Sequence, residues 1–108
     1  MESKLRDIIN YHGVSYQLKY WQGEVYELIE AISDLEVKLK TIDKYGIDYT
    51  REDFLEDFNH IAEEIADNMN MLKEFQLYYD FSDTKINDIM EFKANRHHNE
   101  ILGDSNEA

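Results

Sequence analysis

Two pairs of acidic residues in this sequence have the spacing that metal-binding carboxylates need. Glu24 and Glu27 form the first pair, Glu64 and Asp67 the second, and the members of each pair are three positions apart. On an α-helix this spacing places both carboxylates of a pair on one face. If the two helices pack antiparallel, four oxygen ligands can converge, and charges that close need a cation between them to stay ionised. Ligation by oxygen alone is typical of Mg²⁺ or Mn²⁺.

A helical wheel favours an inward position for the first pair. Glu24 falls in the same sector as Trp21 and the other apolar residues of its helix, and Glu27 lies at the edge of that sector. A carboxylate directed at a core is costly unless something pairs with it. The chain holds 24 acidic residues, however, and pairs with this spacing also occur by chance on solvated helix faces. Both interpretations remain open at this point.

Two amide side chains, Gln17 and Asn68, fall within the apolar stripes of the same helices. We interpret them as residues that orient the metal ligands; the alternative is a satisfied buried hydrogen-bond pair. Tyr20 and Trp21 could stack on a nucleobase. Because Trp21 lies in the apolar stripe, we expect it in the core.

Basic residues are scarce, with 11 Lys and Arg in total, and two of them form a candidate phosphate site. Lys93 and Arg96 lie one helical turn apart and could bind phosphate oxygens. The alternative is compensation of the helix dipole, which contributes a few tenths to about 1 kcal/mol. The adjacent His97 and His98 diverge by about 100° and are expected at the surface. His60 could join the metal site, but we expect it at the surface or core edge.

The apolar spacing predicts four helices and hence an all-α, four-helix bundle-like fold. The helices are expected at residues 2–12, 14–45 and 51–79, followed by a last one that starts after residues 80–83 and ends near His98. The two long helices have about 30 residues each and are therefore about 45 Å long. One short and one medium helix cannot cover the apolar faces of both. We expect a homodimer or homotetramer whose subunits complete each other's core.

Length and composition limit the class of protein. The 108 residues suffice for one domain, expected at residues 1–102, with a disordered tail at residues 103–108. The formal net charge of −13 excludes a general binder of nucleic-acid backbones, which needs a cationic surface. The sequence has no Cys, no apolar run of about 18 residues and no signal-peptide core at its start. We expect a cytoplasmic protein that binds neither nucleic acid nor membranes.

The ordered set of motifs resembles the all-α nucleoside triphosphate pyrophosphohydrolases, the MazG-like superfamily that includes the dimeric dUTPases. The signature of this family is E-x-x-E on one helix and E-x-x-D on a later one, which the two acidic pairs match in order and spacing. With the segments around these pairs, the resemblance covers roughly residues 8–98. The sequence departs from the family pattern at Gly23, where a further Glu is frequent, and at Asn68, where an aliphatic residue is usual.

The resemblance implies Mg²⁺-dependent hydrolysis of an NTP or dNTP to the nucleoside monophosphate and pyrophosphate, with a house-cleaning role in the nucleotide pool. Metal ions would neutralise the triphosphate, and a water bound to the metal or deprotonated by a carboxylate would attack a phosphorus. The implied metal and catalytic residues are Glu24, Glu27, Glu64 and Asp67, and the implied phosphate-binding residues are Lys93 and Arg96.

A rival function is that of an acidic helical interaction protein, which mimics nucleic acid and occupies a basic partner. The net charge favours it, but inward carboxylates do not, because a mimic needs its charge on the outside. A third alternative is a structural bundle without a ligand. A thermal melt with and without Mg²⁺ separates these functions, because a cation that binds the folded state raises the midpoint.

Overall fold

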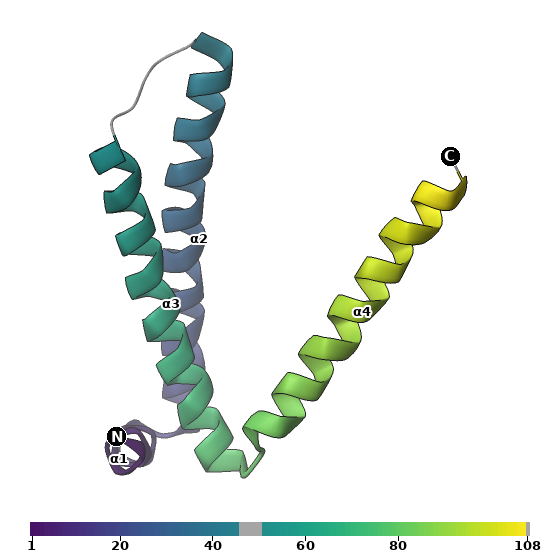
Figure 1. The fold of residues 1–108 in the computed structure, drawn as a ribbon. Coiled ribbons are helices and arrows are strands. Elements are labelled where there is room, and N and C mark those ends of the chain that lie inside the picture. Colours follow the sequence, from purple (N-terminus) through teal and green to yellow (C-terminus); the bar gives the residue numbers. More distant parts are fainter. Residues whose placement is uncertain (46–50, 108) are drawn as a thin grey trace. The chain divides into compact units, whose positions relative to one another are not determined.

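The fold is all-α in the part of the chain that the structure describes. This computed structural model describes residues 1–45 and 51–107, without the side chains of residues 45, 51, 53 and 104–107. Within these ranges the chain forms no strand and four helices (Figure 1): α1 (Glu2–His12), α2 (Val14–Tyr45), α3 (Arg51–Tyr79) and α4 (Asp83–Glu107). The all-α prediction and the expected bounds of the first three helices are confirmed. None of the described helices is long and apolar enough to cross a membrane.

The last helix is longer than the sequence predicts. We expected an end near His98 and a disordered tail at residues 103–108, whereas α4 continues to Glu107; residue 108 lies outside the described residues. The chain contains no Pro that would stop the helix. Gly103 costs only about 1 kcal/mol in a helix interior, and this is too little to end α4 on its own.

The structure divides into two compact units. The first unit, Met1–Tyr78, contains α1, α2 and nearly all of α3, and the second begins at Tyr79 and contains α4. The acidic pairs and the two amides all lie in the first unit. Lys93 and Arg96 lie in the second.

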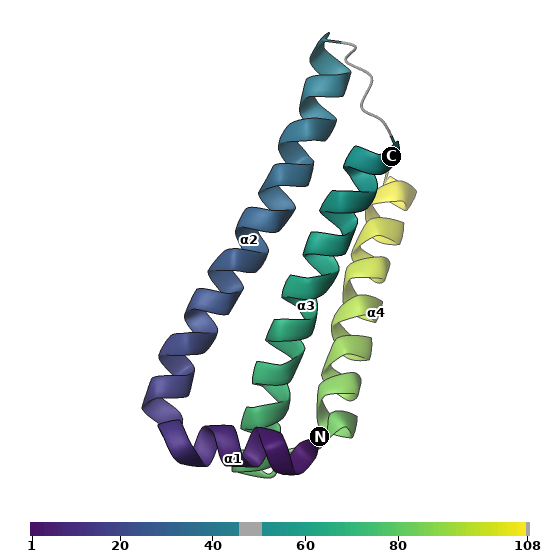
Figure 2. The same ribbon diagram turned by 90° about the vertical axis from the view of Figure 1, so that its left-hand side faces the viewer.

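A glycine permits the sharp change of direction between α1 and α2. Gly13 has a φ of 86°, in the left-handed region that glycine tolerates best, and its N–H donates to the carbonyl of Ile9 at 2.9 Å. The next helix begins at once, and the N–H of Gln17 donates to the carbonyl of Gly13 at 3.1 Å. As a result α1 runs crosswise at the ends of α2 and α3 (Figure 2).

The two long helices pack antiparallel, as the convergence of the acidic pairs requires. Gln17 bonds Glu74 near one end of the pair, and farther along Lys38 forms an ion pair with Asp57 at 2.8 Å. The contact partners of successive α2 residues therefore have decreasing residue numbers on α3, which is the pattern of an antiparallel pair. Both views show the two helices side by side (Figures 1 and 2).

A small apolar core lies where α1 meets α2 and α3. Ile9, Met71 and Phe75 are buried there, and Trp21 packs against them. The rings of Trp21 and Phe75 are stacked, with centroids 5.1 Å apart and an interplanar angle of 18°. The core position predicted for Trp21 is confirmed.

Candidate metal centre

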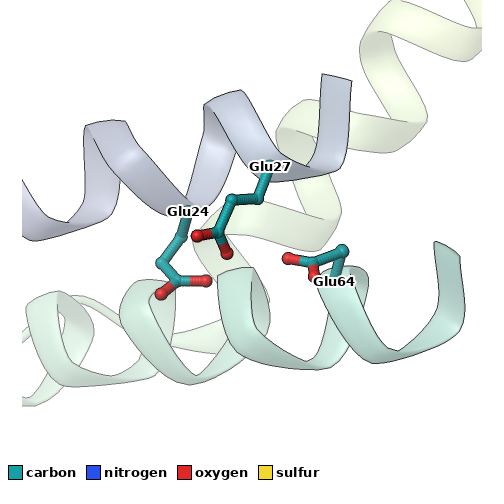
Figure 3. A group of neighbouring side chains, drawn as sticks. All are labelled: Glu24, Glu27 and Glu64. Carbon is teal, nitrogen blue, oxygen red and sulfur yellow. The ribbon is translucent and has the colours of Figure 1, made fainter. Parts of the chain in front are cut away.

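Three carboxylates from two helices meet beside this core. Glu24 and Glu27 extend from α2 toward α3, and Glu64 extends from α3 toward them (Figure 3). Each offers an oxygen, and the three oxygens lie within 4.8 Å of one another. Because α2 and α3 are antiparallel, acidic residues 37 to 40 positions apart in sequence come together.

Two of these carboxylates have a buried oxygen without a protein partner. Glu24 is only 9% exposed, and 12% of the Glu64 side chain is exposed. The Oε2 atoms of both residues are buried and make no hydrogen bond. The Oε1 atom of Glu64 faces Nε2 of His60 at 3.5 Å. A buried acceptor without a partner is costly, and a cation held between the carboxylates would satisfy both oxygens.

Electrostatics at the site also favour a cation. Burial raises the pKa of Glu24 above its ordinary value, and a hydrogen bond from the Tyr20 hydroxyl partly opposes this rise. The negative charges of Glu27 and Asp67 raise the pKa of Glu24 further. The Glu24 carboxylate, mainly through its hydrogen bond, in turn raises the pKa of Tyr20. A positive ion would offset the repulsion that these pKa shifts report.

Asp67, expected as the fourth ligand, lies at the edge of this site. It is exposed and is not among the three residues whose oxygens lie within 4.8 Å. Its charge nevertheless acts on Glu24, and both residues line the same pocket. The role of Asp67 as a ligand stays a prediction.

Asn68 connects the two backbone segments that carry the carboxylates. Its Nδ2 atom donates to the carbonyl of Glu24 at 3.1 Å and to the carbonyl of Glu64 at 2.8 Å. Its Oδ1 atom accepts a bond from Nε1 of Trp21 at 3.2 Å. A single side chain therefore connects α2 to α3 beside the three carboxylates, which supports a positioning role.

Gln17 bonds a residue that the sequence reading missed. Its Nε2 atom donates to Oε1 of Glu74 at 2.7 Å, and both residues are only 3% exposed. Burial raises the pKa of Glu74, while Gln17 and His12 lower it. The sequence contained a signal for this pair, because the same spacing occurs on both helices. Glu74 lies seven positions after Asp67, and Gln17 lies seven positions before Glu24. A spacing of seven returns to the same helix face.

The predicted phosphate residues lie on α4, in the second unit. Lys93 and Arg96 are exposed and one turn apart. The guanidinium of Arg96 lies 5.9 Å from the centroid of the Phe92 ring, a cation–π contact. His97 and His98 are exposed, and the expectation for them is confirmed.

The chain matches no family model, no curated protein and no solved structure. The likeness to MazG-like enzymes therefore rests on the motifs alone. Support for a function has to come from the convergent carboxylates, their unpartnered oxygens and the pocket beside them.

Proposed function

We propose that this protein is a Mg²⁺-dependent nucleoside triphosphate pyrophosphohydrolase that converts an NTP or dNTP and water to the monophosphate and pyrophosphate. One observation carries the proposal: Glu24, Glu27 and Glu64 converge from two antiparallel helices, and two of their buried oxygens lack partners. Oxygen-only donors fit Mg²⁺, or Mn²⁺, better than softer metals. Both the resemblance of the motifs and the geometry support the same chemistry.

The protein groups have distinct parts in this chemistry. Bound Mg²⁺ would supply charge neutralisation of the triphosphate and activation of water. Glu24, Glu27 and Glu64 would hold the cation, and Asp67 would offer a further oxygen from the shared pocket. Asn68 fixes the spacing of the two helix turns.

One carboxylate of the group takes the proton of the attacking water. The water oxygen bonds to phosphorus, an anhydride bond breaks, and pyrophosphate leaves with the electron pair. Lys93 and Arg96 contribute donors to the phosphate oxygens. In cells this activity would serve the nucleotide pool in the cytoplasm.

Burial argues against the rival function of an acidic mimic. A mimic needs its negative charge on its surface, whereas Glu24 is 9% exposed and turned toward α3. A bundle without a ligand would not gain from placing unpartnered carboxylate oxygens at a helix interface. The ligand-binding function accounts for both features.

The exposed apolar side chains of the long helices support a homo-oligomer. On α2 they include Val25, Ile29 and Ile32, and on α3 Phe58 and Ile65, each at least 41% exposed. Large exposed apolar surfaces on a soluble chain mark interaction sites. We propose that a second copy of the chain covers them, in a homodimer or homotetramer.

The decisive experiment is a screen of all common NTPs and dNTPs for pyrophosphate release, with Mg²⁺ and with EDTA. We expect Mg²⁺-dependent release of pyrophosphate from at least one nucleotide. Glu24→Gln should abolish it, whereas the exposed Glu30→Gln on the same helix should not. If no nucleotide is hydrolysed and Mg²⁺ does not change the melting temperature, the proposed function is wrong. The result would then favour an interaction protein or a structural bundle.

A further inference from the structure

A pocket of about 360 Å³ adjoins the metal centre and extends away from it between α1, α2 and α3. Glu24 and Asp67 line it at the metal centre, and Gln17 and Glu74 line it two helical turns away. Seven residues correspond to about 10 Å along a helix. The pocket therefore places a second buried polar pair at a fixed distance from the carboxylates. Its volume is within the usual range for small-molecule sites.

The walls of this pocket include aromatic rings. His12, Tyr16 and Tyr20 all line it. The rings of His12 and Tyr16 are stacked, with centroids 4.6 Å apart and an interplanar angle of 14°. Aromatic side chains in a pocket wall can contact a flat, unsaturated ring by stacking or by edge-to-face packing.

The polar end of the pocket presents hydrogen-bond acceptors. Gln17 donates through Nε2 to Glu74, so its carbonyl oxygen Oε1 keeps its accepting capacity. The Glu74 carboxylate has further lone pairs on both oxygens. Gln17 and Glu74 are each only 3% exposed, so an occupant of the pocket without matching donors would leave these acceptors unpaired.

We propose that this pocket binds the base of the nucleotide substrate and selects guanine; this inference rests on the proposed function. Guanine carries two adjacent donors, its ring N1–H and its 2-amino group, and they match the two oxygens of a carboxylate. Uracil and thymine carry one ring N–H between two carbonyls, which the acceptors of Glu74 and Gln17 repel. Adenine and cytosine offer an amino group beside a ring nitrogen that accepts, so they match only in part.

The expected discrimination follows from the hydrogen bonds at stake. Each bond to the charged Glu74 contributes about 10- to 100-fold in affinity. GTP or dGTP should therefore exceed UTP or dTTP in kcat/KM by at least that factor. Inosine triphosphate tests the 2-amino group alone, because it differs from GTP only in lacking this group. Its kcat/KM should be about 10- to 100-fold below that of GTP.

A variant tests whether Glu74 is the residue that discriminates. Glu74→Gln keeps the size of the side chain and can still accept the bond from Gln17, but it replaces one acceptor with a donor. We expect a 10- to 100-fold loss of kcat/KM for GTP and a smaller loss, or a gain, for UTP. Glu63→Gln, exposed on the same helix, is the matched control and should leave the order of substrates unchanged.

The outcomes separate this inference from the proposed function. Equal kcat/KM for GTP and inosine triphosphate, or an unchanged substrate order in Glu74→Gln, would overturn the guanine pocket and leave the hydrolase intact. If no nucleotide is hydrolysed, the proposed function fails, and NMR titration of the wild-type chain with GMP and with IMP tests the pocket alone. Tighter binding of GMP with shifts at Gln17 and Tyr16 supports the pocket, and equal or absent binding overturns it. The titration needs no variant, so a folding defect of Glu74→Gln cannot obscure the result.

Discussion

The Nδ2 atom of Asn68 on α3 lies 3.1 Å from the backbone carbonyl of Glu24 on α2. The same atom lies 2.8 Å from the carbonyl of Glu64 in its own helix. One amide group therefore sets the register between the two helix turns that supply the candidate metal ligands. The position of a polar residue, Asn68, within the apolar stripe of α3 has a structural reason in these contacts.

Asn68→Ala should loosen this register. The substitution removes the bonds to Glu24 and Trp21, and we expect the free energy of unfolding to fall by about 1–3 kcal/mol. Mg²⁺ binding should also weaken, because the ligands from the two helices are no longer held at a fixed spacing. Urea unfolding and Mg²⁺ titration measure the two effects. Asn59→Ala, exposed on α3, is the control, and equal Mg²⁺ affinity in both variants would contradict the positioning role.

If the proposed Mg²⁺ site exists, Mg²⁺ should raise the melting temperature of the wild-type protein, because a ligand that binds only the folded state stabilises it. Glu24→Gln and Glu64→Gln should each abolish this shift and the turnover. Without metal, both variants should be as stable as the wild type or more stable, since a buried charge and its repulsion are gone. Glu30→Gln and Glu63→Gln, both exposed, control for charge removal on the two helices. Near-native turnover in either test variant would exclude that residue as a ligand.

Glu74 should make stability depend on pH in a defined direction. Burial raises its pKa above the ordinary value of 4.5, so in the pH range just above 4.5 the folded state binds a proton that the unfolded state has lost. The contribution of Glu74 to the unfolding free energy is therefore present at low pH and falls as pH rises from 4.5 through the folded pKa. Glu74→Gln removes this dependence. In urea unfolding at a series of pH values, the variant should gain stability relative to wild type as the pH rises above 4.5. A constant difference would contradict the raised pKa.

Lys93→Ala should lower kcat/KM by about 10- to 100-fold, because a charge-assisted hydrogen bond to phosphate contributes about 1.5–3 kcal/mol. Mg²⁺ affinity without nucleotide should stay the same or rise slightly. Lys85→Ala, exposed on the same helix, is the control. Unchanged kcat/KM would overturn the phosphate role of Lys93. Helix-dipole compensation would not replace that role, because α4 continues to Glu107 and has no basic residue in its last turn. A loss of folding, visible by circular dichroism, would mean that it stabilises the helix instead.

The exposed apolar faces predict a solution mass of at least twice the 12.9 kDa of one chain. Light scattering at micromolar concentration measures it. Ile29→Glu places a charge on the exposed apolar face of α2 and should shift the mass toward one chain. Ser33→Glu, one turn further along that helix, adds the same charge at a polar position. A wild-type monomer at this concentration would refute the oligomer.

The sequence by itself determined the local structure of this protein. Helical periodicity and the ability of Gly13 to adopt a positive φ are local properties of the chain. The bounds of α1, α2 and α3 could therefore be predicted without knowledge of the tertiary structure. The spacing of the acidic pairs and the inward direction of Glu24 followed from the same periodicity. The end of α4 could not be predicted in this way, because the free-energy cost of Gly103 in a helix is too small to decide where the helix ends.

Only the tertiary structure decided which of these side chains meet. Whether an acidic oxygen of α3 comes within 4.8 Å of Glu24 and Glu27 depends on the register and rotation of α3 against α2. The stacking of Trp21 on Phe75 and the hydrogen bonds of Asn68 fix that register. In this register Glu64 lies close to Glu24 and Glu27, whereas Asp67 lies at the edge of the group. The pairing of Gln17 with Glu74 has the same origin. Contacts between residues 57 positions apart depend on how whole helices pack, which local sequence patterns do not encode.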